Sequence, residues 1–309
     1  MVRVAAIQIA PILFNGKKTW EKLENYIREA HDNNAELVTW GETLIPGYPF
    51  WISPTGGASW DNTDQKKTYS SYWREALDFQ NSDILSKIKN IASELKIMMM
   101  GGVAEKSSGS TYCTLITINE EGELINRHRK IKPTYEERLV WADGDGKGIK
   151  TVPFKGYKIG GLNCWENWIP YARAALHKQN ELLHVAVWPG SESITRDITK
   201  FIAKEGRYWV ISVSGLLRTE DLINVSEDDF PLKKLLNLEE KKGKFWQNGG
   251  TVIADPKGKF VNEPLIEKEG IVYADVDFMK AIEERQNFDY SGHYSRFDIF
   301  NNPLKKEEQ

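Results

Sequence analysis

The stretch Gly160-Gly161-Leu162-Asn163-Cys164-Trp165-Glu166-Asn167-Trp168 contains the most informative residue of this chain, Cys164. The apolar residues 157–162 before it predict a buried strand, and the aromatic-rich residues 168–178 after it predict a helix. Cys164 therefore falls where a strand turns into a helix, beside the free N–H groups of a helix start. Their partial positive charges favour a thiolate, the nucleophilic form of cysteine. Free cysteines are also commonly small buried apolar residues, so this position alone leaves both interpretations open.

Two other segments place ionisable groups at the ends of strand-like runs. Trp40-Gly41-Glu42-Thr43-Leu44-Ile45-Pro46-Gly47-Tyr48-Pro49 carries Glu42 directly after the apolar run 36–40. His128-Arg129-Lys130-Ile131-Lys132-Pro133-Thr134-Tyr135-Glu136-Glu137-Arg138 follows the strand-like run 124–128 and supplies cations and further acids. Along the chain, the order is therefore a carboxylate, a cation and a thiol. This combination suits covalent catalysis by an activated cysteine.

These three segments resemble the nitrilase branch of the carbon–nitrogen hydrolase superfamily. The resemblance extends over nearly the whole chain, from Ala6-Ile7-Gln8 to Gly292-His293-Tyr294-Ser295-Arg296. It implies a four-layer α-β-β-α sandwich in which two sheets lie face to face. The residues alone predict only an α/β protein with mixed sheets, because strands alternate with helices and the neighbouring strands 110–118 and 124–128 imply antiparallel pairing.

The periodicity of apolar residues predicts the remaining elements. We expect one domain over residues 1–309, with 288–309 as a C-terminal tail. Residues 43–63 and 219–244 are expected to be irregular, and the polar stretch 131–150 is expected to cover the site. The other expected strands are 2–10, 97–104, 183–188, 208–217 and those within 249–276, and the other expected helices are 20–30, 73–79, 84–95, 194–207 and 278–285.

The resemblance also implies a role for each candidate catalytic residue. Cys164 is the nucleophile, and Glu42 takes its proton and later helps to activate water. Lys130, together with the backbone N–H of Trp165, stabilises negative charge on the substrate nitrogen. Glu137 is the second glutamate, which orients Lys130 and the water.

Alternatives exist for these assignments when the residues are considered without the family. Glu42 could be a helix cap or a surface ion-pair partner, although its place at a strand end before a Pro-Gly-rich loop argues against this. The basic run does not choose among Arg129, Lys130 and Lys132; the family motif Arg-Lys-x-x-Pro-Thr selects Lys130. Glu136 competes with Glu137, and the motif Glu-Arg, here residues 137–138, favours the latter.

Five aromatic residues are candidates for the wall of the substrate pocket: Tyr48, Trp51, Tyr135, Trp168 and Trp188. The chain has 11 tryptophans, most of which must pack in a core or an interface, so each of these residues has that alternative role.

The predicted activity is hydrolysis of an organic nitrile to a carboxylic acid and ammonia, through a thioimidate and an acyl-thioester on Cys164. The sequence Cys164-Trp165-Glu166 resembles nitrilases more than aliphatic amidases or carbamoylases. An amidase acting on a primary amide remains an alternative, because the same residues serve both reactions. A non-enzymatic scaffold homologue is the alternative from another class of protein.

Composition and charge restrict cofactors and partners. The net charge of −3 favours neither nucleic acid nor a membrane surface, and no apolar run approaches membrane-spanning length. The N-terminus lacks the features of a signal peptide, so we expect a cytoplasmic protein without a disulfide. Cys113 lies in a β-branched strand and is interpreted as core packing. The five histidines show no metal-ligand spacing, so no metal and no other cofactor is expected.

The helices at 168–178 and 194–207 carry apolar residues on more than one face. The resemblance implies that this helix pair builds a two-fold interface between subunits. The chain ends at Gln309, whereas many nitrilases carry a longer tail that supports filaments, and Phe297 replaces the usual proline. We therefore expect a homodimer or a small closed homo-oligomer.

Overall fold

The computed structural model describes residues 1–300 and contains two mixed sheets. The first comprises β1 (Val2–Gln8), β2 (Leu37–Ile45), β3 (Leu77–Asp78), β4 (Met98–Ser107), β5 (Ser110–Ile118), β6 (Leu124–Arg129) and β14 (Gly270–Val276). Its order is β14-β1-β2-β4-β5-β6, with β3 paired to β4 off this path. The β1–β2 and β2–β4 pairs are parallel, whereas β4–β5 and β5–β6 are antiparallel. The predicted antiparallel pairing of 110–118 with 124–128 is confirmed.

The second sheet has the order β11-β12-β10-β9-β8-β7, with β13 paired to β12. Its strands are β7 (Val152–Phe154), β8 (Tyr157–Asn163), β9 (Leu183–Trp188), β10 (Trp209–Ser214), β11 (Leu216–Arg218), β12 (Phe245–Ala254) and β13 (Leu265–Ile266). The central strands β8, β9 and β10 are parallel. All six residues of β9 are buried, as expected for a parallel strand covered on both faces.

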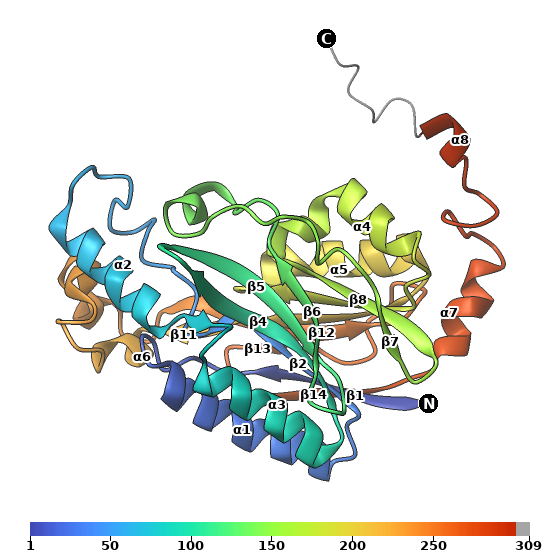
Figure 1. The fold of residues 1–309 in the computed structure, drawn as a ribbon, viewed down its shortest axis with the longest axis horizontal. Coiled ribbons are helices and arrows are strands. Elements are labelled where there is room, and N and C mark those ends of the chain that lie inside the picture. Colours follow the sequence, from blue (N-terminus) through green and yellow to red (C-terminus); the bar gives the residue numbers. More distant parts are fainter. Residues whose placement is uncertain (301–309) are drawn as a thin grey trace.

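The two sheets pack face to face between two layers of helices. Their inner faces share one apolar core, with Val4, Leu37 and Met100 from the first sheet and Val185 and Ile211 from the second. Figure 1 shows α1 (Gly16–Asp32) and α3 (Asp83–Leu95) on one outer side, and α4 (Pro170–His177) and α5 (Glu192–Gly206) on the other. This is the α-β-β-α arrangement that the family resemblance implied.

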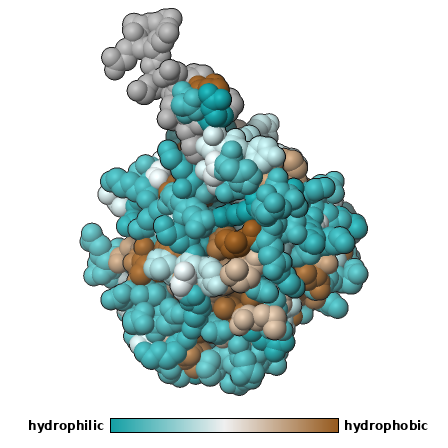
Figure 2. All heavy atoms as spheres, turned by 90° about the vertical axis from the view of Figure 1, so that its right-hand side faces the viewer, coloured by the Kyte–Doolittle hydropathy of each residue, from teal (hydrophilic) through white to brown (hydrophobic). Residues whose placement is uncertain are grey.

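The helices lie on the sheets through stripes of apolar side chains at helical spacing. In α1 the buried stripe includes Trp20, Leu23 and Ile27, and the Asn15 side chain caps the helix by accepting from the N–H of Lys18 at 2.9 Å. Polar residues cover most of the side of the molecule on which α7 (Phe278–Arg285) and the N-terminus lie (Figure 2). No helix among residues 1–300 has the length and apolarity needed to cross a bilayer.

A distortion of β2 sets the direction of Glu42. The strand β2 continues to Ile45, whereas the sequence analysis ended it at Trp40. Its pairing with β4 shifts register between these two residues. Gly102 on β4 permits this path, because a Cβ there would lie 2.6 Å from the Cα of Glu42. Irregularities of this kind re-aim side chains next to functional sites.

The prediction of a helix at 73–79 was wrong. The helix α2 spans Thr63–Glu75, and residues 77–78 form β3. Asn62 caps α2 by accepting from two backbone N–H groups, and the buried face of this helix is largely polar: Thr68, Ser71 and Tyr72. A stripe of this composition gives no apolar periodicity, which explains the error.

The region predicted to be irregular, 219–244, is corrected in part. It contains three short helices, α6 (Thr219–Ile223), η3 (Pro231–Leu236) and η4 (Leu238–Lys241). Apolar residues between its charges, including Leu222 and Phe230, enter a buried aromatic cluster with Phe14, Phe50 and Trp51. Near the C-terminus, α8 (Phe297–Phe300) ends the described chain. The remainder of the predicted tail, residues 301–309, lies outside it.

Candidate active site

Cys164 sits on a sharp turn between β8 and the 3-10 helix η2 (Cys164–Trp168). Its φ of 48° places it in the left-handed region, which non-glycine residues adopt mainly at special turns and functional sites. The Asn167 side chain holds the turn by donating to the carbonyl of Cys164 at 2.9 Å and to that of Leu162 at 3.2 Å. The predicted helix from Trp168 starts instead at Pro170, because the turn first closes as η2.

Lys130 lies directly after β6 and is held between two buried carboxylates. Its Nζ donates to Glu42 Oε1 at 3.0 Å and to Glu137 Oε2 at 2.7 Å. All three side chains are 3% exposed or less. Glu137 comes from the 3-10 helix η1 (Tyr135–Leu139), and its Oε1 accepts from the Tyr48 hydroxyl at 2.9 Å. The fold thus brings Glu42 to a cation and a second carboxylate that lie about 90 residues further along the chain.

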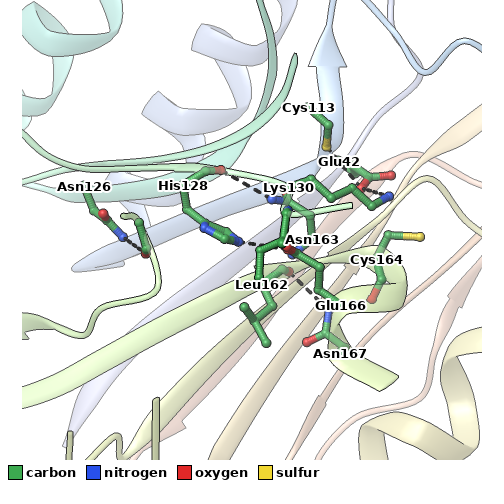
Figure 3. A network of polar contacts seen from close by, with 12 residues as sticks. Glu42, Cys113, Asn126, His128, Lys130, Leu162, Asn163, Cys164, Glu166 and Asn167 are labelled. Carbon is green, nitrogen blue, oxygen red and sulfur yellow. Dashed lines mark hydrogen bonds and ion pairs between the residues drawn. The ribbon is translucent and has the colours of Figure 1, made fainter. Parts of the chain in front are cut away.

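The thiol of Cys164 lies next to this ion cluster. Single ligand atoms of Glu42, Glu137 and Cys164 all fall within 4.8 Å of one another, and Figure 3 shows Glu42, Lys130 and Cys164 gathered at one place. The same trio has the spacing of a metal site. However, Lys130 already bonds both carboxylates and supplies the neutralising positive charge at that position. The four side chains therefore form one buried cluster in which Lys130 lies between the two carboxylates.

Burial and neighbouring charges together shift the pKa values of this cluster. It raises the pKa of Glu42 to about 7, against the opposing charge of Lys130. Burial alone would lower the pKa of Lys130, but Cys164, Glu42 and Glu137 together raise it well above its usual value. Burial also raises the pKa of the Cys164 thiol, although Lys130 and the N–H of Trp165 act in the opposite direction. The helix-start N–H group of Trp165 thus lowers the pKa of the thiol, as the sequence suggested, but burial outweighs it.

Cys113 contacts the site, a role that the sequence analysis did not foresee. It packs in the aromatic cluster as expected, but its Sγ also donates to Glu42 Oε1 at 3.3 Å. Burial, followed by the charge of Glu42, raises the pKa of Cys113 well above its usual value, so this thiol stays protonated and serves as a donor. The β-branched pattern around Cys113 indicated a buried strand but carried no sign of its neighbour across the sheet.

Glu166 ties the lysine segment to the cysteine turn. Its Oε2 lies 2.9 Å from His128 Nε2 and accepts from the N–H of Asn163 at 2.9 Å, while its Oε1 accepts from the N–H of Ile131 at 2.7 Å (Figure 3). Burial would raise the pKa of Glu166, but these donors hold it below its usual value. The pattern Asn163-x-x-Glu166 is a capping box and could have indicated this role from sequence.

A pocket of about 290 Å³ opens onto the thiol. Tyr48, Trp188 and the predicted oxyanion residue Trp165 line it together with Cys164 and Glu137. The sequence analysis did not single out the other lining residues as pocket residues: Phe50, Thr134, Glu136, Pro189, Gly190, Ile194, Trp246 and Gln247. Thr134 and Glu136 belong to the stretch expected to cover the site, whereas Trp246 and Gln247 come from the distant strand β12.

Three predicted wall residues occupy other positions. Trp51 is buried in the aromatic cluster and lines a separate cavity. Tyr135 is 82% exposed, although its neighbours Thr134 and Glu136 face the pocket. Trp168 stacks on Trp165, with ring centroids 5.6 Å apart, and so supports a lining residue from behind.

Comparison with known proteins agrees with this geometry. The family model for carbon-nitrogen hydrolases matches residues 3–286. The chain belongs to the carbon–nitrogen hydrolase family. It is 32% identical to an aliphatic nitrilase from Rhodococcus rhodochrous, over 96% of this chain and 78% of that protein. It is also 32% identical to an arylacetonitrilase from Aspergillus niger, over 96% of this chain and 90% of that protein.

Solved structures of this family share the fold of this carbon–nitrogen hydrolase. A carbon-nitrogen hydrolase from Helicobacter pylori G27 superposes with a TM-score of 0.72 at 18% identity, covering 99% of this chain and 98% of that one. An amidase from Nesterenkonia sp. gives a TM-score of 0.70 at 15% identity, covering 98% and 96%. At these identities the similarity establishes the fold alone.

The raised pKa of Glu42 predicts how the thiol should respond to pH. We expect alkylation of Cys164 by iodoacetamide to accelerate as the pH rises through about 7, because only ionised Glu42 can accept the thiol proton. Below that pH both groups remain protonated and the thiol is a poor nucleophile. The rate is measured by mass spectrometry of the labelled peptide.

The matched variant for this experiment is Glu42→Gln, which keeps the shape of the side chain but cannot accept the proton. It should remove the rise near neutral pH and leave only the slower rise at high pH from direct ionisation of the thiol. A profile that Glu42→Gln does not alter would mean that another group controls the thiol.

Proposed function

We propose that this chain is a nitrilase, which hydrolyses an organic nitrile to a carboxylic acid and ammonia. The observation that carries the proposal is the buried set of Glu42, Lys130, Glu137 and Cys164 at the base of an aromatic-walled pocket. Relatives named as nitrilases, at about 30% identity over most of the chain, support the choice of substrate.

The first half of the proposed reaction forms a bond between Cys164 Sγ and the nitrile carbon. Glu42 takes the thiol proton, which its pKa of about 7 allows at neutral pH. As the C≡N bond becomes C=N, negative charge builds on nitrogen, and Glu42 delivers to it the proton taken from the thiol. Lys130 and the N–H of Trp165, which both lower the pKa of the Cys164 thiol, stabilise that charge. The product is a thioimidate on Cys164.

The second half consumes two waters. The first adds to the thioimidate carbon, after which the C–N bond breaks and ammonia leaves an acyl-thioester. The second water attacks the thioester carbon, gives a proton to Glu42 and releases the acid as the C–S bond breaks. Glu137 holds Lys130 through its 2.7 Å contact and thereby keeps the cation in place throughout.

Amidase activity is the second candidate, because a primary amide enters the same path at the tetrahedral stage and needs the same residues. Amidases appear among the structural neighbours, but only as evidence of fold. We further propose that residues 1–309 act as one catalytic unit, since the site draws Glu42 and Lys130 from the first sheet and Cys164 from the second. A reducing compartment such as the cytoplasm would keep Cys113 and Cys164 as free thiols.

The proposal predicts a covalent adduct on one cysteine. Incubation with slowly turned-over aromatic, arylacetic, aliphatic and dinitrile substrates should yield ammonia and, by intact mass, an acyl or imidate adduct on Cys164. The variant Cys164→Ala should form neither, because Cys164 is the only thiol among the described residues that line the pocket. Primary amides are tested in parallel: a kcat/KM for amides that exceeds every nitrile would replace nitrilase by amidase.

The contact of Lys130 with both carboxylates predicts a large loss in Lys130→Met. We expect ammonia release to fall by at least about 10²-fold, since a preorganised cation at the developing charge is removed. Lys132→Met is the matched control, because Lys132 is exposed and pairs only with Asp143. It should retain nearly full activity.

The neighbouring acids provide a second matched pair for the same prediction. Glu137→Gln loses the charge that holds Lys130, whereas Glu136 has no ion-pair partner among residues 1–300 and only faces the pocket. A severe loss in Glu136→Gln combined with a silent Glu137→Gln would reverse the assignment.

We propose that the α4–α5 surface forms a two-fold interface between subunits. The apolar residues of this region divide into two sets. Ala172, Ile198 and Ile202 are buried against the sheet, whereas Trp168, Ile169, Tyr171, Ile194 and Phe201 are 39–66% exposed. A surface of this kind favours pairing with its own copy, at roughly 25 cal/mol for each Å² removed from water.

This proposal predicts a discrete oligomer in solution. Light scattering after gel filtration should give at least twice the chain mass of 35.4 kDa at micromolar concentration. Phe201→Glu should reduce that mass, while Met279→Glu, a charge placed at an exposed apolar residue on α7, should not. A fully active monomer of the unmodified chain would contradict the interface.

A further inference from the structure

A second, much smaller cavity lies behind Glu42. Its volume is about 10 Å³, which is close to the minimum that holds one water molecule. Its polar boundary consists of Glu42, Tyr48, Ser214 and Gln247. The rest of its wall is apolar or backbone: Ile7, Ile9, Pro11, Gly41, Leu44 and Gly215.

Three of the residues around this cavity carry buried polar atoms with no hydrogen-bond partner among the described residues. They are Glu42 Oε2, Ser214 Oγ and Gln247 Nε2, and all three side chains are at least nine-tenths buried. Buried polar atoms in native proteins are nearly always satisfied, and leaving one unsatisfied is costly. The carboxylate oxygen of Glu42 can accept a hydrogen bond, the amide nitrogen of Gln247 can donate one, and the hydroxyl of Ser214 can do either. Three such partners match the two to four hydrogen bonds that a buried water makes.

The neighbouring residues hold these atoms in place. The other oxygen of Glu42, Oε1, is already occupied by Lys130 at 3.0 Å and Cys113 at 3.3 Å, so only Oε2 remains for a further partner. The backbone N–H of Ser214 donates to the Thr251 hydroxyl at 3.0 Å, which fixes the residue on β10. The site is therefore built by residues from β2, β10 and β12.

The small cavity adjoins the substrate pocket. Tyr48 and Gln247 line both of them and form the partition between the two. Glu42 borders the small cavity and lies beside Cys164, which opens onto the large one. The side chain of Glu42 therefore lies between a molecule in the small cavity and an adduct on the thiol of Cys164.

We propose that this cavity is a water site, in which Ser214 and Gln247 hold one water against Glu42 Oε2 and keep it ready for the hydrolytic half of the reaction. The inference rests on the proposed nitrilase function. Ser214 and Gln247 are positioning residues, since they act through the water and Glu42. Formation of the thioimidate needs no water, whereas both later steps need one each.

The steps that this water serves balance without another reactant. A water oxygen bonds to the adduct carbon and its proton passes to Glu42. In the first step that proton goes on to the nitrogen, the second proton of the water follows it as the C=O bond forms, and the C–N bond breaks to release ammonia. In the second step the C–S bond breaks, and the proton returns from Glu42 to the Cys164 thiolate as the acid leaves.

The test separates formation of the adduct from its hydrolysis. Ser214→Ala and Gln247→Met each remove one partner of the water and preserve the approximate size of the side chain. In both variants we expect ammonia release to fall about ten-fold. In Ser214→Ala, whose side chain does not line the substrate pocket, the adduct on Cys164 should form at a rate within about two-fold of the unmodified enzyme. The adducted fraction at steady state, measured by intact mass, should rise accordingly.

Ser71→Ala is the matched control, because Ser71 is a buried serine on α2 outside both cavities, and it should change neither rate. Equal slowing of both phases in Ser214→Ala and Gln247→Met, or no change in the adducted fraction, would overturn the water site. A crystal structure without a density peak within hydrogen-bond distance of the three atoms would also overturn it. The nitrilase proposal fails separately, if the unmodified enzyme forms no adduct on Cys164 with any nitrile.

Discussion

The contact of Lys130 with Glu42 and Glu137 is the constraint that the rest of the structure has to satisfy. Removing three charges from water costs several kcal/mol for each ion, and their attraction repays this only when the geometry is good. Breaking such a cluster by deleting one member typically costs about 3–5 kcal/mol. The cluster is thus a poor source of stability, and the two sheets with their shared core must supply the folding energy that keeps it buried.

The fold holds this cluster in register with Cys164 by a second buried carboxylate. Glu166 accepts hydrogen bonds from Ile131, next to Lys130, and from Asn163, next to Cys164, so one side chain spans the two sheets. His128 completes the contact set from β6. Because a displacement of about 1 Å can cost two orders of magnitude in rate, a rigid link between cation and nucleophile matters as much as their identity.

Much of the fold was predictable because strands and amphipathic helices leave periodic patterns. β5, β9 and α7 have the bounds expected from sequence, whereas α2 was misplaced because its buried face is polar. The grouping of Glu42, Lys130 and Glu137 was predicted because their segments resemble family motifs in the same order along the chain. The contact of Cys113 with Glu42, and the entry of Trp246 and Gln247 into the pocket, depend on neighbours across a sheet, and no local pattern encodes such neighbours.

The raised pKa of Cys164 explains why the site combines a thiol with a carboxylate instead of relying on a free thiolate. A neutral thiol beside ionised Glu42 carries the same net charge as a thiolate beside protonated Glu42, so the cluster can exchange one form for the other without taking up a proton from solvent. Lys130 stays charged in both forms, because its anionic neighbours raise its pKa by more than burial lowers it. In the proposed reaction it therefore remains available for the charge that develops on the substrate.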